Sequence, residues 1–306
     1  MKNKKVSVLI GTFNRSKLLS RVLDSILNQS YKNIEIIVVD DCSSDNTKEV
    51  LESYALEYPN HFKYLINEKN MGISYNCNRA FEISSGDYFA LVGDDDYWID
   101  IDKIQKQIDV LKNDKNIGVV GTWWQEDNTK MVIEKKPLEP QNWEEKMLSG
   151  GGIICGSTPL ITKEAWEKVC GFDEKQKRGT DSDLFRRIVL SGYKAKIIYE
   201  ITTSVDTNIN RNRMTSSHNQ VQTYQNHINS MEYNLQKLKD HYDEYPRAKA
   251  FYTEKLSSLY RNKFIINNDK KDLIKSLSYM ENSIKLDLTV KKILKLIYIK
   301  FKVIFV

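Results

Sequence analysis

The sequence predicts an α/β protein whose mostly parallel sheet is covered by helices on both faces and is followed by a helical C-terminal region. Through residue 92, apolar runs of strand length alternate with amphipathic helical patterns, the order that builds a parallel sheet. Two of these runs end directly in acidic residues. Beyond about residue 219, turn signals become rare and long helical patterns rich in Lys, Tyr and Asn take over.

An amphipathic helix separates the first two predicted strands. Residues 6–10 (VSVLI) form a short buried strand because they are apolar, largely β-branched and followed by Gly11. Residues 34–39 (IEIIVV) form the second strand for the same reason. Between them, apolar side chains recur every three or four residues, as on one helix face: Leu18, Leu19, Val22, Leu23, Ile26 and Leu27.

Two further strands continue the alternation. Residues 43–45 (SSD) supply N-cap oxygens for the next helix, residues 62–66 form a third strand, and residues 74–83 form a helix. The fourth strand, residues 87–92, runs directly into Gly93 and three aspartates. Since ligands bind where the carboxyl ends of parallel strands meet, we expect both acidic groups at one edge of the sheet.

The rest of the chain falls into two predicted domains. Helices are predicted over residues 101–111 and 162–169 and from residue 183, with a strand over residues 117–120. The change of pattern places a boundary near residue 218, which gives a catalytic domain at 1–218 and a helical region at 219–306.

The composition narrows the class of protein. With 41% hydrophobic and 28% charged residues, the 306-residue chain is long and apolar enough to fold around its own core. The four cysteines lack zinc-site spacing, which indicates reduced thiols. The first apolar run is too short for a signal peptide, and no uncharged apolar stretch reaches 18 residues, so we expect a cytoplasmic protein. We expect no nucleic-acid partner.

The acidic triplet, Asp94, Asp95 and Asp96, is the first candidate site. Three adjacent carboxylates repel one another unless a hard divalent cation neutralises them. Mg²⁺ or Mn²⁺ suits these oxygen ligands and shares its shell with substrate phosphates. The preceding strand favours this metal–diphosphate interpretation over a solvated turn that caps the next helix.

Two weaker candidates concern the donor. The acidic pair, Asp40 and Asp41, ends the second strand, where a carboxylate can accept a hydrogen bond from a base N–H or a ribose hydroxyl; capping the next helix is the alternative. Arg211 and Arg213 stand beside hydroxyl residues and could clamp a phosphate, although an RxR pattern is also typical of a solvated surface.

The last candidate is a pair of acids before a helix. Asp181 and Asp183 precede an apolar-periodic stretch, so we expect one of them to cap the helix and the other to point outward. A structural role in capping is one interpretation of both acids. A partly buried Asp at this position could instead act as a general base for an attacking hydroxyl.

Five segments in order resemble the family 2 glycosyltransferases, a group with the GT-A fold. They are VSVLIGTFNR at 6–15, VVDDCSSDNT at 38–47, NMGISYNCNRA at 70–80, SGDYFALVGDDDYW at 85–98, and GFDE with TDSDL at 171–184. The resemblance covers roughly residues 5–216. It implies a Rossmann-like sheet and an inverting, metal-dependent transferase that uses a nucleotide-activated sugar, usually a UDP-sugar, to transfer a hexosyl or N-acetylhexosaminyl group.

The resemblance assigns residues to the donor. It implies that Thr12 and Asn14 line the nucleotide pocket and that Asp41 meets the base, with Asp40 beside it. Within the same segments we also expect donor contacts from Arg15, Asn70, Gly72 and Asp94.

The resemblance also assigns the metal and the base, with two departures. Asp95 matches the metal-contacting last acid of the DxD motif, and Asp181 matches the catalytic base. The first acid of the motif falls at Gly93, so the metal set is either Asp94 with Asp95 or Asp95 with Asp96. Where the family often has a His after the base, this chain reads NRNRMTSSH at 210–218, so Arg211, Arg213 or His218 takes that role.

Residues 285–306 carry the excess charge of the chain. Six Lys and one Asp give this tail a net charge of +5, which equals that of the whole chain. Lys291, Lys295 and Lys302 share a helical face with Tyr298, which is typical of an interfacial helix attracted to anionic lipid; Lys300 breaks the pattern. A terminal helix packed on the core or on another subunit is the alternative. Docking would make the protein peripheral on the inner face of the cell membrane.

The acceptor is expected to be a hydroxyl of a glycan or lipid-linked molecule in cell-surface polysaccharide synthesis, and a homo-oligomer is left open. The alternatives are a catalytically silent sugar-nucleotide-binding protein and a nucleotidyltransferase, although GTFNR is not a basic Gly-rich phosphate loop. A response-regulator receiver would carry its acidic pair after the first strand. A dinucleotide dehydrogenase is disfavoured because no GxGxxG follows that strand.

Overall fold

The structure is a computed structural model that describes residues 4–126, 140, 142–150, 153–206 and 220–305. The chain divides into two compact units. The first comprises residues 1–141, 152–174 and 180–208, and the second comprises residues 142–151, 175–179 and 209–306. The expected boundary at residue 218 lies outside the described residues, so it stays a prediction.

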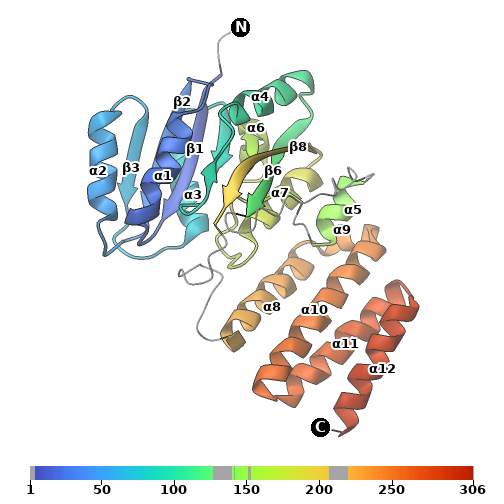
Figure 1. Cartoon of the computed structure of the whole chain (residues 1–306). Helices are drawn as coiled ribbons and strands as arrows, with labels where there is room; N and C mark the ends of the chain where they lie inside the picture. Colours follow the sequence, from blue (N-terminus) through green and yellow to red (C-terminus); the bar gives the residue numbers. More distant parts are fainter. Residues whose placement is uncertain (1–3, 127–139, 141, 151–152, 207–219, 306) are drawn as a thin grey trace. The chain divides into compact units, whose positions relative to one another are not determined.

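The first unit contains an eight-stranded sheet with the order β3-β2-β1-β4-β7-β6-β8-β5 (Figure 1). The first four strands in sequence are parallel: β1 (Val6–Thr12), β2 (Ile34–Asp40), β3 (Phe62–Ile66) and β4 (Tyr88–Leu91). These are the four strands that the apolar runs predict. The predicted α/β class with a mostly parallel sheet is therefore confirmed.

The other half of the sheet is mixed. It comprises β5 (Tyr97–Trp98), β6 (Ile117–Glu126), β7 (Leu160–Thr162) and β8 (Lys194–Val205). Strand β7 runs antiparallel between β4 and β6, whereas β6 and β8 are parallel. The predicted strand at 117–120 was too short, because β6 continues beyond it along the long strand β8.

Helices cover both faces of this sheet. They are α1 (Ser16–Leu27), α2 (Thr47–Glu57), α3 (Ile73–Glu82), α4 (Lys103–Asn113), α6 (Lys163–Lys168) and α7 (Thr180–Leu190). The expected cap at 43–45 is only partly realised: Asp45 accepts the Thr47 N–H at 3.1 Å, but the N-cap position is Asn46, whose side chain makes no capping bond.

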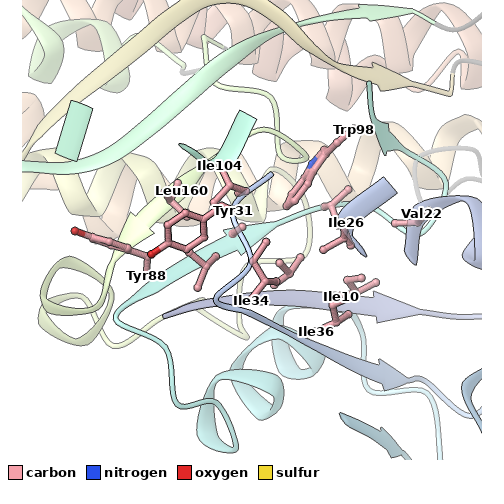
Figure 2. Close-up of a cluster of buried hydrophobic side chains, with 14 of the residues drawn as sticks. Ile10, Val22, Ile26, Tyr31, Ile34, Ile36, Tyr88, Trp98, Ile104 and Leu160 are labelled. Carbon is pink, nitrogen blue, oxygen red and sulfur yellow. The ribbon is translucent and has the colours of Figure 1, made fainter. Parts of the chain in front are cut away.

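Successive side chains of the central strands point to opposite faces of the sheet, and each face packs in an apolar layer. On one face, Ile10 and Ile36 pack with Val22 and Ile26 of α1 (Figure 2). On the other face, Phe89 of β4 meets aromatic rings of α3 and α6, with centroid distances of 4.7 Å to Phe81 and 5.7 Å to Trp166. Because helices bury both faces of the sheet, we expect a ligand-binding site at the strand ends and in the loops that follow them.

The second unit is helical, as predicted for the C-terminal region. It comprises α5 (Trp143–Leu148), α8 (Gln220–Lys237), α9 (Lys239–Glu244), α10 (Pro246–Asn267), α11 (Lys270–Leu286) and α12 (Val290–Phe305). Helices α10 and α11 approach closely at Ser257 and Ser276, whose hydroxyls each donate to the other's carbonyl at 2.8 Å. Among the described helices, none is long and apolar enough to span a membrane.

Candidate active site

The carboxyl ends of β1, β2 and β4 bring the predicted site residues to one edge of the sheet. The backbone N–H of Asp41 donates to the Thr12 carbonyl at 2.8 Å, and that of Phe13 donates to Asp94 Oδ2 at 3.2 Å. The loop after β1 thus contacts both the acidic pair and the acidic triplet. The predicted meeting of the two acidic groups at one sheet edge is confirmed.

Asp41 organises the loop that leads into α3. Its buried carboxylate accepts N–H groups from Met71 at 2.7 Å and Gly72 at 2.9 Å, and the Asn67 side-chain amide at 2.8 Å. Gly72 has a positive φ of 88°, a conformation that favours glycine. The carboxylate therefore fixes this loop, and a direct bond from Asp41 to a base stays a prediction.

Asp40 and Asn14 join the loops after β1 and β2. The Asp40 carboxylate accepts the Ser43 N–H at 3.3 Å, and burial, aided by the charges of Asp45 and Asp41, raises its pKa. Asn14 also contacts this loop, because its N–H donates to Ser43 Oγ and its side-chain oxygen accepts the Ser44 N–H, both at 2.8 Å. Thr12 is buried beside them, whereas Asn70 is exposed.

The three aspartates of the triplet have different surroundings. Asp96 is buried, and its oxygens accept the Asp206 N–H at 3.0 Å and the Ser157 hydroxyl. Asp94 turns toward the loop after β1 and lies 3.8 Å from Arg15 Nε; burial and the charge of Asp95 raise its pKa to about 7. Asp95 is partly exposed, and within the described part of the chain no hydrogen bond reaches its carboxylate.

The surroundings of Gly93 disfavour an acid at this position, where the DxD motif would have its first acid. Its N–H donates to Ser157 Oγ at 2.9 Å. A Cβ at this position would lie 3.1 Å from Asp95 Oδ1, 3.2 Å from Asp96 Oδ2 and 3.3 Å from Ser157 Oγ. These contacts are tighter than ordinary van der Waals contacts, so an acidic side chain has little room there. The carboxylates of Asp95 and Asp96 are both close to this glycine, whereas that of Asp94 accepts the Phe13 N–H.

Asp181 lies against the same short segment as the triplet. Helix α7 begins at Thr180, three residues before the predicted start, so Asp181 stands in its first turn. Its Oδ1 accepts the Ser182 N–H at 2.7 Å, and burial raises the pKa of the carboxyl. Its Oδ2 is 2.9 Å from the position of a Cβ on Gly156. Since the neighbouring Ser157 donates to Asp96, the segment 156–157 contacts both acids.

Of the two acids before the predicted helix, Asp183 is the one that faces the interior. Its side chain is fully buried and accepts Arg187 Nε at 2.8 Å. Arg187 also donates to the carbonyls of Val169 at 2.6 Å and Gly171 at 2.8 Å. Arg187 thus ties α7 to the turn at 169–171, and it supplies the partner that an ionised Asp183 carboxylate needs inside the protein.

Three residues of this site were not singled out by sequence. Ser157 binds the triplet as described. Arg21 of α1 donates to the Asp95 carbonyl at 3.0 Å, lies 4.2 Å from the Tyr97 ring centroid and 3.7 Å from Asp206. In the sequence, Arg21 looks like any charged residue on the polar face of a helix, and nothing marks Asp206. For Ser157, the available signal was the run of three glycines at 150–152, which precedes it by a few residues.

The metal and phosphate candidates are only partly within the described residues. Arg211, Arg213 and His218 lie outside them. Among the described residues, no group of three or more His, Cys, Asp or Glu side chains is arranged to hold a metal ion. A divalent ion at the triplet would therefore need ligand oxygens from a bound substrate, which is how Mg²⁺ is usually held.

Ser157→Ala is expected to loosen the triplet. It removes the acceptor for the Gly93 N–H and the donor to buried Asp96, which costs about 2 kcal/mol of unfolding free energy. Chemical denaturation measures this cost. Ser53→Ala, which removes an exposed hydroxyl on α2, is the matched control and should cost less than about 0.5 kcal/mol. Equal effects of the two changes would contradict the role given to Ser157.

Comparison with known proteins agrees with these observations. The family model described as "Glycosyl transferase family 2" matches residues 7–169, which hold the acidic pair and the triplet. The "Putative glycosyltransferase EpsE" of Bacillus subtilis is 26% identical over 282 residues, which are 89% of this chain and 98% of that protein.

Two solved structures share the fold. TarS 1–349 of S. aureus in complex with UDP-GlcNAc has a TM-score of 0.68 at 18% identity and covers 92% of this chain and 81% of that one. The mannosyltransferase PcManGT from Pyrobaculum calidifontis in complex with GDP-Man and Mn²⁺ has a TM-score of 0.62 at 16% identity and covers 99% of this chain and 81% of that one.

Proposed function

The chain belongs to glycosyl transferase family 2, and from this premise we propose that it is an inverting transferase that uses a UDP-sugar. The sugar goes to a hydroxyl of a glycan or lipid-linked acceptor in cell-surface polysaccharide synthesis. Glycosyltransferase membership and the GT-A fold, both expected from the motifs, are confirmed by the relatives and the structural neighbours.

One observation carries the proposal. The triplet and the half-buried acid Asp181 both lie against the two-residue segment Gly156 and Ser157, at the carboxyl ends of the strands. A sugar transferase needs a place for the departing diphosphate and, on the other side of the sugar, a base for the incoming hydroxyl. The two kinds of acid at this edge match those two requirements.

The donor nucleoside is proposed to bind over the loops after β1, β2 and β3. Thr12, Asn14 and Arg15 come from the first of these loops, and Asp40 and Asp41 hold the other two. The UDP-GlcNAc and GDP-Man complexes of the two structural relatives support a nucleotide-sugar donor. Asn70 and Gly72 are assigned to the same subsite, because the Asp41 carboxylate fixes the backbone around them.

The triplet fits a divalent ion that shares its shell with a diphosphate. Asp95 has a partly exposed carboxylate free of other hydrogen bonds in the described chain, and Asp96 lies next to it above Gly93. Bound there with the donor, Mn²⁺ or Mg²⁺ would neutralise charge that develops on the leaving diphosphate. Arg211 and Arg213 are proposed to contact the same phosphates, which suits the planar donor fork of arginine.

Asp181 is proposed as the general base. It accepts the proton of the acceptor hydroxyl as that oxygen bonds to the anomeric carbon, while the bond from that carbon to the diphosphate breaks. The two events occur on opposite faces of the sugar, so its configuration inverts. The Ser182 N–H donates to the Asp181 carboxylate, and the absence of a side chain at Gly156 leaves room for it.

The pH dependence of turnover should reflect this base. Because burial raises the pKa of Asp181, kcat should be retained above that raised pKa and fall as the pH decreases through it. Asp94, whose pKa is raised to about 7, is the competing source of such a decline. When the rate of nucleotide release is measured against pH, Asp94→Asn should still show the decline at low pH. If the decline disappears in this variant, Asp94 and not Asp181 causes it.

Thermal unfolding with donors tests the function. A ligand at about 100 times its Kd stabilises the folded state by about 2.7 kcal/mol, which raises Tm by several degrees. We expect this shift from at least one UDP-sugar with Mn²⁺ and a smaller one from UMP, which lacks the second phosphate. No shift from any UDP-, GDP- or dTDP-sugar would contradict the proposal.

A further inference from the structure

Helix α12 packs on the second unit with only one of its faces. Ile299 is fully buried in a cluster with Phe264, Leu273 and Met280, and Leu296 and Val303 pack against this cluster. The helix is therefore held by apolar contacts with its neighbours. A terminal helix packed on its neighbours is one of the alternatives that the sequence of the tail left open, and this packing accounts for the buried face alone.

The opposite face of α12 is apolar and exposed. Its side chains are between 37% and 63% exposed and recur at helical spacing: Ile293, Leu294, Ile297, Tyr298 and Phe301. We call these five residues the α12 strip. A surface helix normally presents polar residues on this side, and a contiguous exposed apolar patch marks an interaction site.

Lysines border the α12 strip on both sides. At about 100° per residue, Lys291 and Lys302 follow Tyr298 around the helix, and Lys300 stands next to Ile293 on the other border. Lys291 is exposed, and Lys302 Nζ lies 6.0 Å from the Tyr298 ring centroid. Acidic partners stand on the protein side, where Lys300 pairs with Glu281 at 3.2 Å and Lys295 pairs with Glu254. The outward side is apolar with a cationic rim.

We propose that the α12 strip docks on the surface of an anionic lipid bilayer. An apolar face rimmed by lysines fits the boundary between acyl chains and headgroups, because long lysine side chains bury their methylenes and keep the ammonium group at headgroup level. Lysines near such a surface gain further from its negative potential. Five lysines in this 16-residue helix oppose insertion across the hydrocarbon core, so the helix lies in the plane of the surface.

Vesicle flotation of the full chain tests this proposal. We expect binding to vesicles of phosphatidylcholine that contain about 30% phosphatidylglycerol, an anionic lipid, and much weaker binding to vesicles of phosphatidylcholine alone. Leu294→Glu should weaken binding at least about tenfold, since it puts a charge into the apolar face. Leu56→Glu, the same change at an 86% exposed leucine of α2, should leave binding unchanged.

The lysines are tested separately with the apolar strip intact. Lys291→Gln and Lys302→Gln should each weaken binding to anionic vesicles about fivefold and reduce its sensitivity to salt. Nucleotide release in solution should be the same in Leu294→Glu and wild type, so a failure of docking is distinguishable from a failure of the proposed function.

Several outcomes would overturn the proposal. They are no binding to anionic vesicles, equal binding by Leu294→Glu and Leu56→Glu, and equal binding to charged and neutral vesicles. Sedimentation that shows self-association lost in Leu294→Glu, without vesicle binding, would instead assign the α12 strip to a second copy of the chain.

Discussion

Asp181→Asn is expected to lower kcat about 10³-fold while donor affinity stays within about twofold of wild type. Asn has the same size and can still accept the Ser182 N–H through its side-chain oxygen, but it cannot take a proton from the acceptor hydroxyl. The rate of nucleoside diphosphate release at saturating donor measures kcat, and calorimetric titration measures donor affinity.

Asp183→Asn is the matched control in the same helical turn. Asp183 is buried and paired with Arg187, so its loss should lower the free energy of unfolding by about 3 kcal/mol. The folded fraction of this variant should keep a turnover near that of wild type. Wild-type turnover in Asp181→Asn would take the role of base away from Asp181.

Asp95→Ala is expected to weaken donor binding in Mn²⁺ and to lower kcat/KM by about 10²–10³-fold. In the described chain no hydrogen bond depends on the Asp95 carboxylate, and Arg21 binds its backbone carbonyl, so the triplet should keep its shape. Calorimetry at several Mn²⁺ concentrations measures the loss as a reduced metal dependence of donor affinity.

Two comparisons interpret that result. Asp102→Ala, a change at an exposed aspartate just before α4, should bind donor as wild type does. Asp96→Ala should instead destabilise the protein, since both carboxylate oxygens of Asp96 accept protein hydrogen bonds. An unchanged Mn²⁺ dependence in Asp95→Ala would remove this residue from the metal role.

Local patterns in the sequence predict the first half of the fold well. The runs at 6–10, 34–39, 62–66 and 87–92 became β1 to β4 with ends within two residues. For β1, β2 and β4 the reason is that burial on both faces demands continuous apolar strands. Strand β7 was missed because it is only three residues long and pairs antiparallel with residues far away in the sequence.

The sequence predicted which residues form the candidate site but not their hydrogen-bond partners. The sequence places acids at the ends of β2 and β4, yet it cannot indicate that Asp41 binds the amides of Met71 and Gly72 or that Ser157 bonds to Asp96. Those contacts join segments 30 and 61 residues apart and exist only after the sheet has formed. Which of Asp181 and Asp183 faces the interior could not be predicted for the same reason, since burial is a tertiary property.

Metal-dependent release of UDP is the direct test of the proposed transferase activity. Wild-type protein, the same protein after chelation of metal, and Asp95→Ala are each incubated with a panel of UDP-sugars. We expect UDP release from at least one donor by wild-type protein with Mn²⁺ or Mg²⁺, and a loss of that release after chelation and in the variant. No release from any donor, or equal release by Asp95→Ala, would contradict it.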